Sequence, residues 1–330
     1  MNIRRLGATA AALVLATTLA ACGDSGGSNV GGGDTQTLKV GLIGIGSDAA
    51  VKIAEEEGYF AEENIKVEST VVANPPAGIA AAQSGQLDIA YAPSIPVLNA
   101  LSENVPLKVI GAADGYPENS EDVEPRDLDD TGLFANPDAG INSPKDLEGK
   151  SVSVPARKAQ LEVTIANSVS EDGGDPSKIN WMVLDPSSAL QSLQQKRVDA
   201  VGLVSPFTAR ASSEGGKYVA SPGVEFFGEG AIGLWVAGES TTENKAEAIA
   251  SFQRAMKKAN EYANENYEEA EQYASELTNI PVETLKEGAH TYWPTDVTLE
   301  QIQDVNKKLA DLGYLSKEVE LDDSLILESK

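Results

Sequence analysis

Beyond residue 37, short apolar runs alternate with stretches whose apolar positions have helical spacing. The first half of this alternation predicts strands over 38–43, 65–72 and 87–92, and helices over 48–57, 76–84 and 94–101. Ser47 can cap the first of these helices, and Gly58 is typical of its end. Strands and helices that alternate at this spacing are typical of a parallel sheet built from βαβ units.

The same order of elements returns after Gly149. It predicts strands over 151–154, 179–184 and 199–204, and helices over 160–169, 187–195 and 206–213. At a nearly constant spacing along the chain, Val40, Leu42, Asp88 and Ser94 overlay on Val152, Val154, Asp199 and Ser205. Any two α/β stretches can be overlaid, but the paired Asp and Ser residues favour a true repeat, which predicts two α/β lobes of like topology. From Thr241 onward the chain is mostly helical in pattern, with helices expected from 246, over 267–277, 282–289 and 299–312.

The N-terminal segment reads as an export signal. Arg4 and Arg5 precede a short apolar run that ends in Leu19-Ala20-Ala21-Cys22, and this run is shorter than the roughly 20 residues of a membrane span. The ending looks like a bacterial lipobox, in which the Cys is acylated and becomes the first mature residue. We therefore expect a signal peptide over 1–21, a lipid on Cys22, and a flexible Gly-rich linker over 22–37. A plain signal peptide with an incidental Cys is the alternative.

Composition narrows the classes of partner. The chain of 330 residues has a formal net charge of −26, which disfavours nucleic acid and anionic lipid surfaces as ligands. The membrane is therefore expected to hold the protein through the lipid and not through charge. Cys22 is the only Cys of the sequence, so an intramolecular disulfide is excluded.

Four segments resemble the substrate-binding proteins of ABC importers, in the type 2 periplasmic-binding fold. These segments are Ala54-Glu55-Glu56-Glu57-Gly58-Tyr59-Phe60, Gly85-Gln86-Leu87-Asp88-Ile89-Ala90, Ile141-Asn142-Ser143-Pro144-Lys145-Asp146-Leu147-Glu148-Gly149-Lys150 and Arg197-Val198-Asp199-Ala200. Among these proteins, the chain resembles the branch that takes up nitrate, sulfonates and taurine, with relatives that bind thiamine pyrimidine precursors. The resemblance implies a monomeric, extracytoplasmic protein with no cofactor that hands a small solute to permease subunits. It also implies lobe 1 over 38–140 plus 224–330 and lobe 2 over 141–223, with crossings near 131–141 and 221–236.

A ligand of two such lobes would lie beyond the carboxyl ends of the parallel strands, where helix N-termini also point. The loops there supply the candidate ligand-binding residues, which are Gly46, Ser47, Asn74, Ser94, Arg157, Lys158, Ala159, Ser205 and Phe207, with Tyr116 as a possible stacking partner. The Ser residues can equally be helix caps only. Asp88, Asp199 and Asp185 are expected to be structural.

The class of ligand is left open between two alternatives. Arg157 could hold a sulfonate or nitrate-type anion by paired hydrogen bonds, which is the favoured reading, or could form an ion pair with one of the many acids. Tyr116 and Phe207 could instead stack on a pyrimidine or another aromatic heterocycle.

An enzyme on the same fold is the main alternative of another class. The sequence has one His, His290, and neither a Ser-His-acid set nor a metal-ligand spacing. We therefore expect no catalytic residue, no bound metal and no enzymatic activity. A solute sensor for a membrane receptor would need the same cleft, so the sequence leaves that alternative open.

Overall fold

The computed structural model describes residues 35–118, 120 and 122–328. The expected signal peptide, Cys22 and the linker up to Asp34 lie outside these residues. Gln36 and Thr37, which the expected linker included, belong to the first strand.

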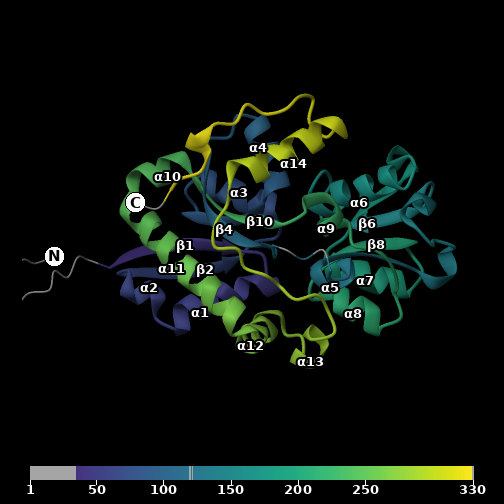
Figure 1. Ribbon diagram of the computed structural model, residues 1–330, viewed down its shortest axis with the longest axis horizontal. Coiled ribbons are helices and arrows are strands. Elements are labelled where there is room, and N and C mark those ends of the chain that lie inside the picture. Colours follow the sequence, from purple (N-terminus) through teal and green to yellow (C-terminus); the bar gives the residue numbers. More distant parts are fainter. Residues whose placement is uncertain (1–34, 119, 121, 329–330) are drawn as a thin grey trace, which may run out of the picture. The chain divides into compact units, whose positions relative to one another are not determined.

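Two five-stranded sheets organise the described part of the chain (Figure 1). The first has the order β2-β1-β3-β10-β4, formed by Ile65–Val71, Gln36–Leu42, Ile89–Pro93, Gly230–Gly238 and Leu107–Tyr116. The second has the order β7-β6-β8-β5-β9, formed by Asn180–Val183, Ser151–Val154, Ala200–Val204, Thr131–Ala135 and Lys217–Ala220. The first three strands of each order are parallel, and the fourth is antiparallel to both of its neighbours. The two sheets therefore share one topology, as the sequence repeat predicts.

The chain crosses between the sheets twice. It leaves the first sheet after β4 and enters the second at β5, and it returns after β9 to form β10. Residues 131–140 were expected in lobe 1, whereas Thr131–Ala135 pairs with β8 and β9 of the second sheet. This corrects the boundary: the first crossing ends before Thr131. We call the first sheet with its helices lobe 1, and the second sheet with its helices lobe 2.

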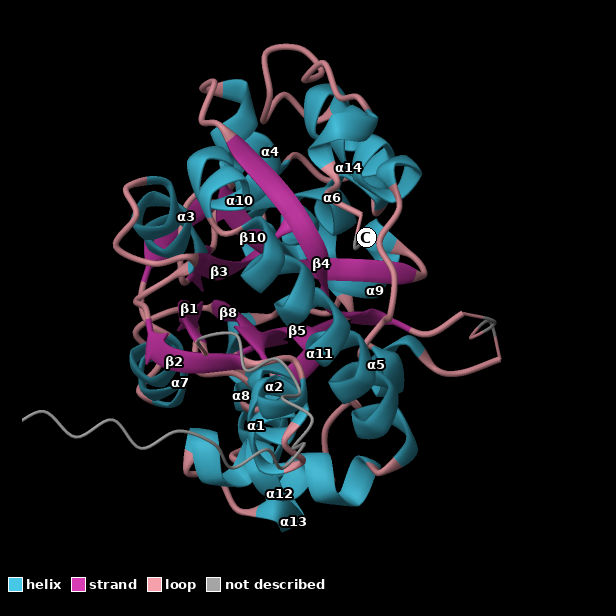
Figure 2. Ribbon diagram, turned by 90° about the vertical axis from the view of Figure 1, so that its left-hand side faces the viewer, coloured by secondary structure: helices cyan, strands magenta, loops and turns pink. Residues whose placement is uncertain are grey.

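Helices cover both faces of each sheet (Figure 2). They are α1 (Ala49–Glu56), α2 (Tyr59–Glu62), α3 (Pro75–Gln83), α4 (Ser94–Ser102), α5 (Pro125–Leu128), α6 (Gln160–Glu171), α7 (Pro186–Gln194), α8 (Phe207–Ser213), α9 (Pro222–Phe227), α10 (Glu239–Asn244), α11 (Ala246–Glu265), α12 (Tyr267–Thr278), α13 (Val282–Leu285) and α14 (Leu299–Asp311). The expected helix over 282–289 ends early, at Leu285.

Alternating residues of the strands supply two cores in each lobe. In β10, Trp235 packs with α1, α11 and α12, whereas Leu234 and Val236 pack with α3, α4 and α14 on the other face. In lobe 2, Val152 and Val154 pack with α6, and Val201 and Leu203 pack with α7 and α8. Each sheet is thus buried on both faces, as is typical of doubly wound α/β folds.

Two pairs of polar residues show how closely the lobes repeat. Asp88 accepts a hydrogen bond from the backbone N–H of Lys39 at 2.8 Å, and Asp199 accepts one from Ser151 at 2.8 Å. Each Asp directly precedes one strand and bonds to the backbone of the adjacent parallel strand, within β1 for Asp88 and at the start of β6 for Asp199, which confirms the structural role predicted for both.

Candidate functional site

A cavity of about 150 Å³ lies where the carboxyl ends of the parallel strands of both lobes meet. We call it the inner cavity. Lobe 1 contributes Ile43, Ile45, Ala73, Asn74, Pro75, Tyr91, Pro93 and Pro96; lobe 2 and the start of β5 contribute Asp130, Thr131, Pro155, Ala156, Ala159, Gln160, Leu161, Pro186 and Val204. The loops that follow the strands at 44–48, 74–76, 92–94, 155–159 and 185–187 all reach this lining, and Val204 directly precedes the loop at 205–207.

The lining is mostly apolar, with a few polar side chains. Asn74, Tyr91, Asp130, Thr131 and Gln160 carry the side-chain polar groups of the described wall. A concave, largely apolar site with a small number of polar groups is typical of small-molecule binding.

Two acidic side chains lie in and behind this wall, the half-buried Asp130 and the buried Asp114. The Tyr91 hydroxyl donates to Asp114 Oδ2 at 2.9 Å, and the backbone N–H of Gly233 donates to Asp114 Oδ1 at 3.0 Å. Burial raises the pKa of Asp114, and it raises the pKa of Asp130 well above its usual range, with the charges of Asp114 and Asp129 adding to the effect on Asp130. Within the described chain, neither carboxyl group lies within 4.0 Å of a Lys, Arg or His nitrogen.

A second interlobe cavity of about 380 Å³, the outer cavity, adjoins the inner one at Pro96 and Ala159. Arg157 and Lys158 lie in its wall, opposite residues of α3 and α4. Arg157 Nε is 2.5 Å from Glu162 Oε2, so its guanidinium is already paired with a carboxylate whose side chain is 3% exposed. Asn99 Nδ2 of α4 donates to the Lys158 carbonyl at 2.8 Å, which links the two lobes beside this cavity.

The structure brings only some of the predicted residues together. Asn74 and Ala159 line the inner cavity, and Arg157, Lys158 and Ala159 line the outer one. The lining of either cavity does not include Gly46, Ser47, Ser94, Ser205, Phe207 or Tyr116. Ser47 and Ser94 are buried, and the backbone N–H of Ser205 donates to the carbonyl of Asp130, directly behind the wall.

Tyr116 lies at the junction of the two crossings and not in the cleft. Its hydroxyl donates to Asp129 Oδ1 at 2.5 Å, and its side chain is buried. Asp129 also accepts hydrogen bonds from Thr131 N at 2.8 Å, Gly223 N at 2.8 Å and Val224 N at 3.1 Å. One carboxylate therefore ties the end of β4, the start of β5 and the start of α9 together, and we call this arrangement the crossing clamp.

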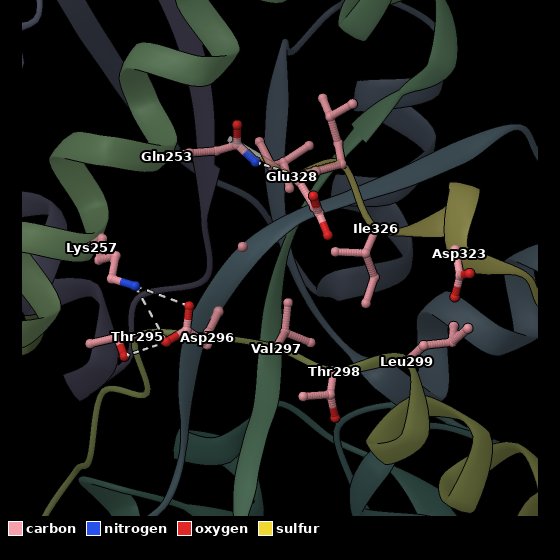
Figure 3. A pocket seen from close by; sticks show the side chains of 14 residues that line it. Gln253, Lys257, Thr295, Asp296, Val297, Thr298, Leu299, Asp323, Ile326 and Glu328 are labelled. Carbon is pink, nitrogen blue, oxygen red and sulfur yellow. Dashed lines mark hydrogen bonds and ion pairs between the residues drawn. The ribbon is translucent and has the colours of Figure 1, made fainter. Parts of the chain in front are cut away.

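A third cavity, of about 510 Å³, is a groove in lobe 1 alone (Figure 3). Its walls come from β4, α11, the segment before α14 and the C-terminal segment that pairs Ile326 with Val109. Lys257 Nζ lies 3.0 Å from Asp296 Oδ1, so the cation in this wall is already paired (Figure 3). A molecule in this groove would contact one lobe only, which makes the interlobe cavities the better candidate site.

Sequence reasoning missed the residues that carry the chemistry of the inner cavity, which are Tyr91, Asp130 and Gln160. Tyr91 is near the end of a strand, where the alternation of β3 turns its ring toward the α1 and α11 side. The adjacent acids Asp129 and Asp130 stand directly before β5. This pair was the signal in the sequence that could have indicated Asp130 as a residue of the cavity wall.

The described residues include neither a metal-binding cluster nor a membrane-spanning helix. Within 35–118, 120 and 122–328, no group of three or more His, Cys, Asp or Glu side chains is placed to hold a metal ion. In the same residues, no helix has the length and apolarity needed to cross a membrane.

Comparisons with known proteins agree with this architecture. A protein of Bacillus subtilis (strain 168), provisionally named for binding aliphatic sulfonates, is 22% identical over 309 residues, which cover 92% of this chain and 88% of that protein. The alkanesulfonate-binding protein SsuA from Xanthomonas axonopodis pv. citri, solved with MOPS bound, shares the fold with a TM-score of 0.73 at 14% identity, over 90% of this chain and 99% of its own. The periplasmic nitrate-binding protein NrtA from Synechocystis PCC 6803 does so with a TM-score of 0.68 at 14% identity, over 86% and 82%.

These named relatives are binding proteins. The model of the NMT1/THI5-like family matches residues 48–270, from the first helix of lobe 1 through all of lobe 2 to α12. The match spans more than half of the chain. It includes all lining residues of the inner cavity except Ile43 and Ile45, which follow β1. The chain therefore belongs to the NMT1/THI5-like family.

Proposed function

We propose that this chain is an extracytoplasmic solute-binding protein that captures a small solute between its lobes and delivers it to the permease subunits of an ABC importer. The observation that carries the proposal is the inner cavity, whose wall is built by both lobes at the ends of their parallel strands. A solute held there contacts both lobes at once, so its binding free energy favours the closed arrangement. The proposal includes no catalytic step.

The named relatives support the same role, since each is named for binding a small solute. Their names offer a sulfonate or nitrate as the solute, which is the anion favoured by the sequence analysis. A pyrimidine or another heterocycle is the second candidate, and the chemistry of the inner wall bears on this choice.

Thermal melts with a library of sulfonates, nitrate, pyrimidines and flavins test solute capture. A bound solute should raise the Tm by mass action, and small-angle scattering should show compaction at saturation. Ala159→Trp should abolish the shift, because Ala159 lies in the walls of both cavities. Ala61→Trp, at an exposed position of α2, is the matched control. A Tm shift that survives Ala159→Trp would place the solute outside the interlobe cavities and contradict the proposal.

We also propose that Cys22 carries the lipid that holds the protein on the extracytoplasmic membrane face. The motive is Leu19-Ala20-Ala21-Cys22 followed by a Gly-rich stretch. Cys22→Ser should remain unprocessed or leave the membrane fraction, which cell fractionation and the mass of the mature chain measure. Normal amounts of processed Cys22→Ser protein in the membrane would refute the anchor and leave solute capture untouched.

A further inference from the structure

Residues 288–294 lie between α13 and α14 and belong to no helix or named strand; we call this segment the strap. Its first residue, Gly288, lies against α8 of lobe 2, since a Cβ atom at this position would be 3.2 Å from the Cβ atom of Ala209. Further along, Trp293 belongs to the core of lobe 1 that α1 and α11 cover. The strap therefore contacts lobe 2 at one end and the interior of lobe 1 near the other.

Two asparagines of α11 hold the backbone of the strap in lobe 1. Asn264 Oδ1 accepts from Trp293 N at 3.0 Å, and Asn264 Nδ2 donates to the Trp293 carbonyl at 2.8 Å. Asn260, about one turn earlier on the same helix, donates from Nδ2 to the Pro294 carbonyl at 2.7 Å. The backbone on both sides of the indole is thus fixed to a long helix of lobe 1.

From this fixed backbone, the Trp293 side chain reaches the loop that follows β1. Its indole Nε1 donates to the Ser47 carbonyl at 3.0 Å, and the residue is 1% exposed. The same loop supplies Ile43 and Ile45 to the lining of the inner cavity, whereas Trp293 is not part of that lining. Trp293 therefore contacts the cavity wall from outside the cavity.

The hydrogen bonds of this loop fall into two kinds. Asp48 Oδ2 accepts from Gly44 N at 2.7 Å and from Ile45 N at 3.1 Å, and because these bonds lie within the loop they set its shape. The bond from Trp293 to the Ser47 carbonyl instead joins the loop to a segment 246 residues further along the chain. It therefore helps to set the position of the loop relative to α11 and the strap.

On the basis of the proposed function, on which this inference rests, we infer that Trp293 is a positioning residue of the solute site. It does not touch the solute, but through its hydrogen bond to the Ser47 carbonyl it holds Ile43 and Ile45 where they line the inner cavity. Without this donor the loop is less well ordered in the empty protein. A solute then has to order the loop as it binds, which weakens its affinity.

Trp235 offers a matched control for the loss of the indole N–H. It is 2% exposed and belongs to the same core as Trp293. Its Nε1 atom, however, has no hydrogen-bond partner in the described part of the chain. Trp293→Phe and Trp235→Phe therefore remove the same buried atoms, and each should lower the Tm through lost packing. Only Trp293→Phe also removes a bond to the loop.

Hydrogen exchange of the full chain, measured by mass spectrometry on peptides that cover 43–48, tests the inference without any solute. In Trp293→Phe these amides should exchange about 10-fold faster than in the parent, because a buried hydrogen bond is lost. In Trp235→Phe they should exchange at the rate of the parent. Peptides that cover β6 in lobe 2 should be unchanged in both variants, which separates a local effect from a general loss of stability.

Calorimetry with ethanesulfonate, nitrate and cytosine measures the consequence for binding. Trp293→Phe should lower the affinity for whichever of these probes binds the parent by about 10-fold. Trp235 is not the control here, because its ring packs edge-to-face on Tyr91 of the cavity wall, with ring centroids 6.0 Å apart. Trp181→Phe, in the edge strand β7 of lobe 2, should leave the affinity unchanged.

Three results would overturn the inference. Exchange of 43–48 in Trp293→Phe at the rate of the parent, or equal acceleration in Trp235→Phe, would mean that Trp293 only fills the core. Parent-like affinity of Trp293→Phe despite faster exchange would mean that the loop does not shape the site. In each case a probe that Ala159→Trp blocks still upholds solute binding. Failure of the solute-binding proposal itself looks different, since then no probe is blocked by Ala159→Trp, whatever the exchange of the loop.

Discussion

The side chain of Asp48 is a buried carboxyl group whose pKa makes the stability of the protein depend on pH. It lies under the loop that lines the inner cavity, and its Oδ2 atom accepts from two backbone N–H groups of that loop. Burial raises the pKa of Asp48 to about 7, because desolvation outweighs the hydrogen bonds to Ile45 and Gly44. An unfolded Asp loses its proton near its ordinary pKa, so between roughly pH 4 and 7 the folded state binds more protons than the unfolded state.

The stability of the protein should therefore fall as the pH rises from 4 to 7, by roughly 3 to 4 kcal/mol from Asp48 alone. Asp48→Asn should flatten this part of the profile and raise the Tm at pH 8 relative to the parent, since an amide still accepts from the loop. Melts at half-unit pH intervals measure both effects. Asp146→Asn is the control of opposite sign, because hydrogen bonds from Asn142 and Ser143 lower the pKa of the half-buried Asp146. If the dependence of stability on pH is the same in Asp48→Asn as in the parent, Asp48 does not cause the fall in stability between pH 4 and 7.

The sequence alone could not decide whether Arg157 binds an anionic ligand or forms an ion pair with an acidic residue. A cation in a loop before a helix suits an anionic ligand and an ion pair equally well, and the pairing with Glu162 depends on how the first turn of α6 is placed. Ser47 and Ser94 were candidates for the same reason, yet both side chains are buried. Asp88 and Asp199 were predictable because strand starts in a repeated unit leave few alternatives.

At the scale of elements, the two lobes contain a matched pair of helix caps. Asn74 caps α3 and Asp185 caps α7, each accepting at 3.0 Å from the backbone N–H three residues on, and each helix has Pro in its first turn. Asn74→Ala and Asp185→Ala should each cost about 1 kcal/mol of unfolding free energy, which denaturant titration measures. The conservative variants Asn74→Asp and Asp185→Asn should keep most of this contribution to the unfolding free energy. A loss in one lobe only would contradict the equivalence of the caps.

The local βαβ units were predictable because periodicity and caps are encoded within a few residues of each other. Four strands escaped prediction: β4, β5, β9 and β10. Each of them pairs with segments far away in the sequence, and β10 also carries register shifts against β4 that blur a regular pattern. The apolar run around Trp235 is typical of a buried segment, and Trp235 is 2% exposed, but such a run does not specify which residues the ring will contact.

At the scale of the whole molecule, the crossing clamp joins both passages between the lobes. Asp129→Asn should reduce the unfolding free energy by roughly 2 to 4 kcal/mol, since an amide nitrogen cannot accept from Gly223 and Val224 and leaves these buried N–H groups without a partner. Denaturant titration measures the loss, with exposed Asp127→Asn as control. Gly223→Ala is an independent probe, because its Cβ would lie 2.2 Å from Tyr116 Oη. Parent-like stability in both variants would rule out a clamp.

The bond between Asn99 and the Lys158 carbonyl makes a separate prediction about solute release. Asn99→Ala removes a contact between the lobes and should speed dissociation of a bound solute about 3- to 10-fold, with little change in association. Stopped-flow displacement measures this rate. Asn180→Ala removes a similar hydrogen bond, to the Gly149 carbonyl within lobe 2, and should leave the rate unchanged. Equal effects of the two variants would mean that the Asn99 contact does not gate release.

The place of β10 in the first sheet has a consequence for the order in which the chain folds as it is synthesised. All strands of the second sheet lie between Thr131 and Ala220, so that sheet is complete as soon as this continuous stretch has emerged. The first sheet waits for Gly230–Gly238, because β10 is the strand that joins β4 to β3. The lobe whose translation begins second is thus the first that can finish folding. A nascent chain that stops before Gly230 holds a finished second lobe beside a first lobe whose β4 has no strand to pair with.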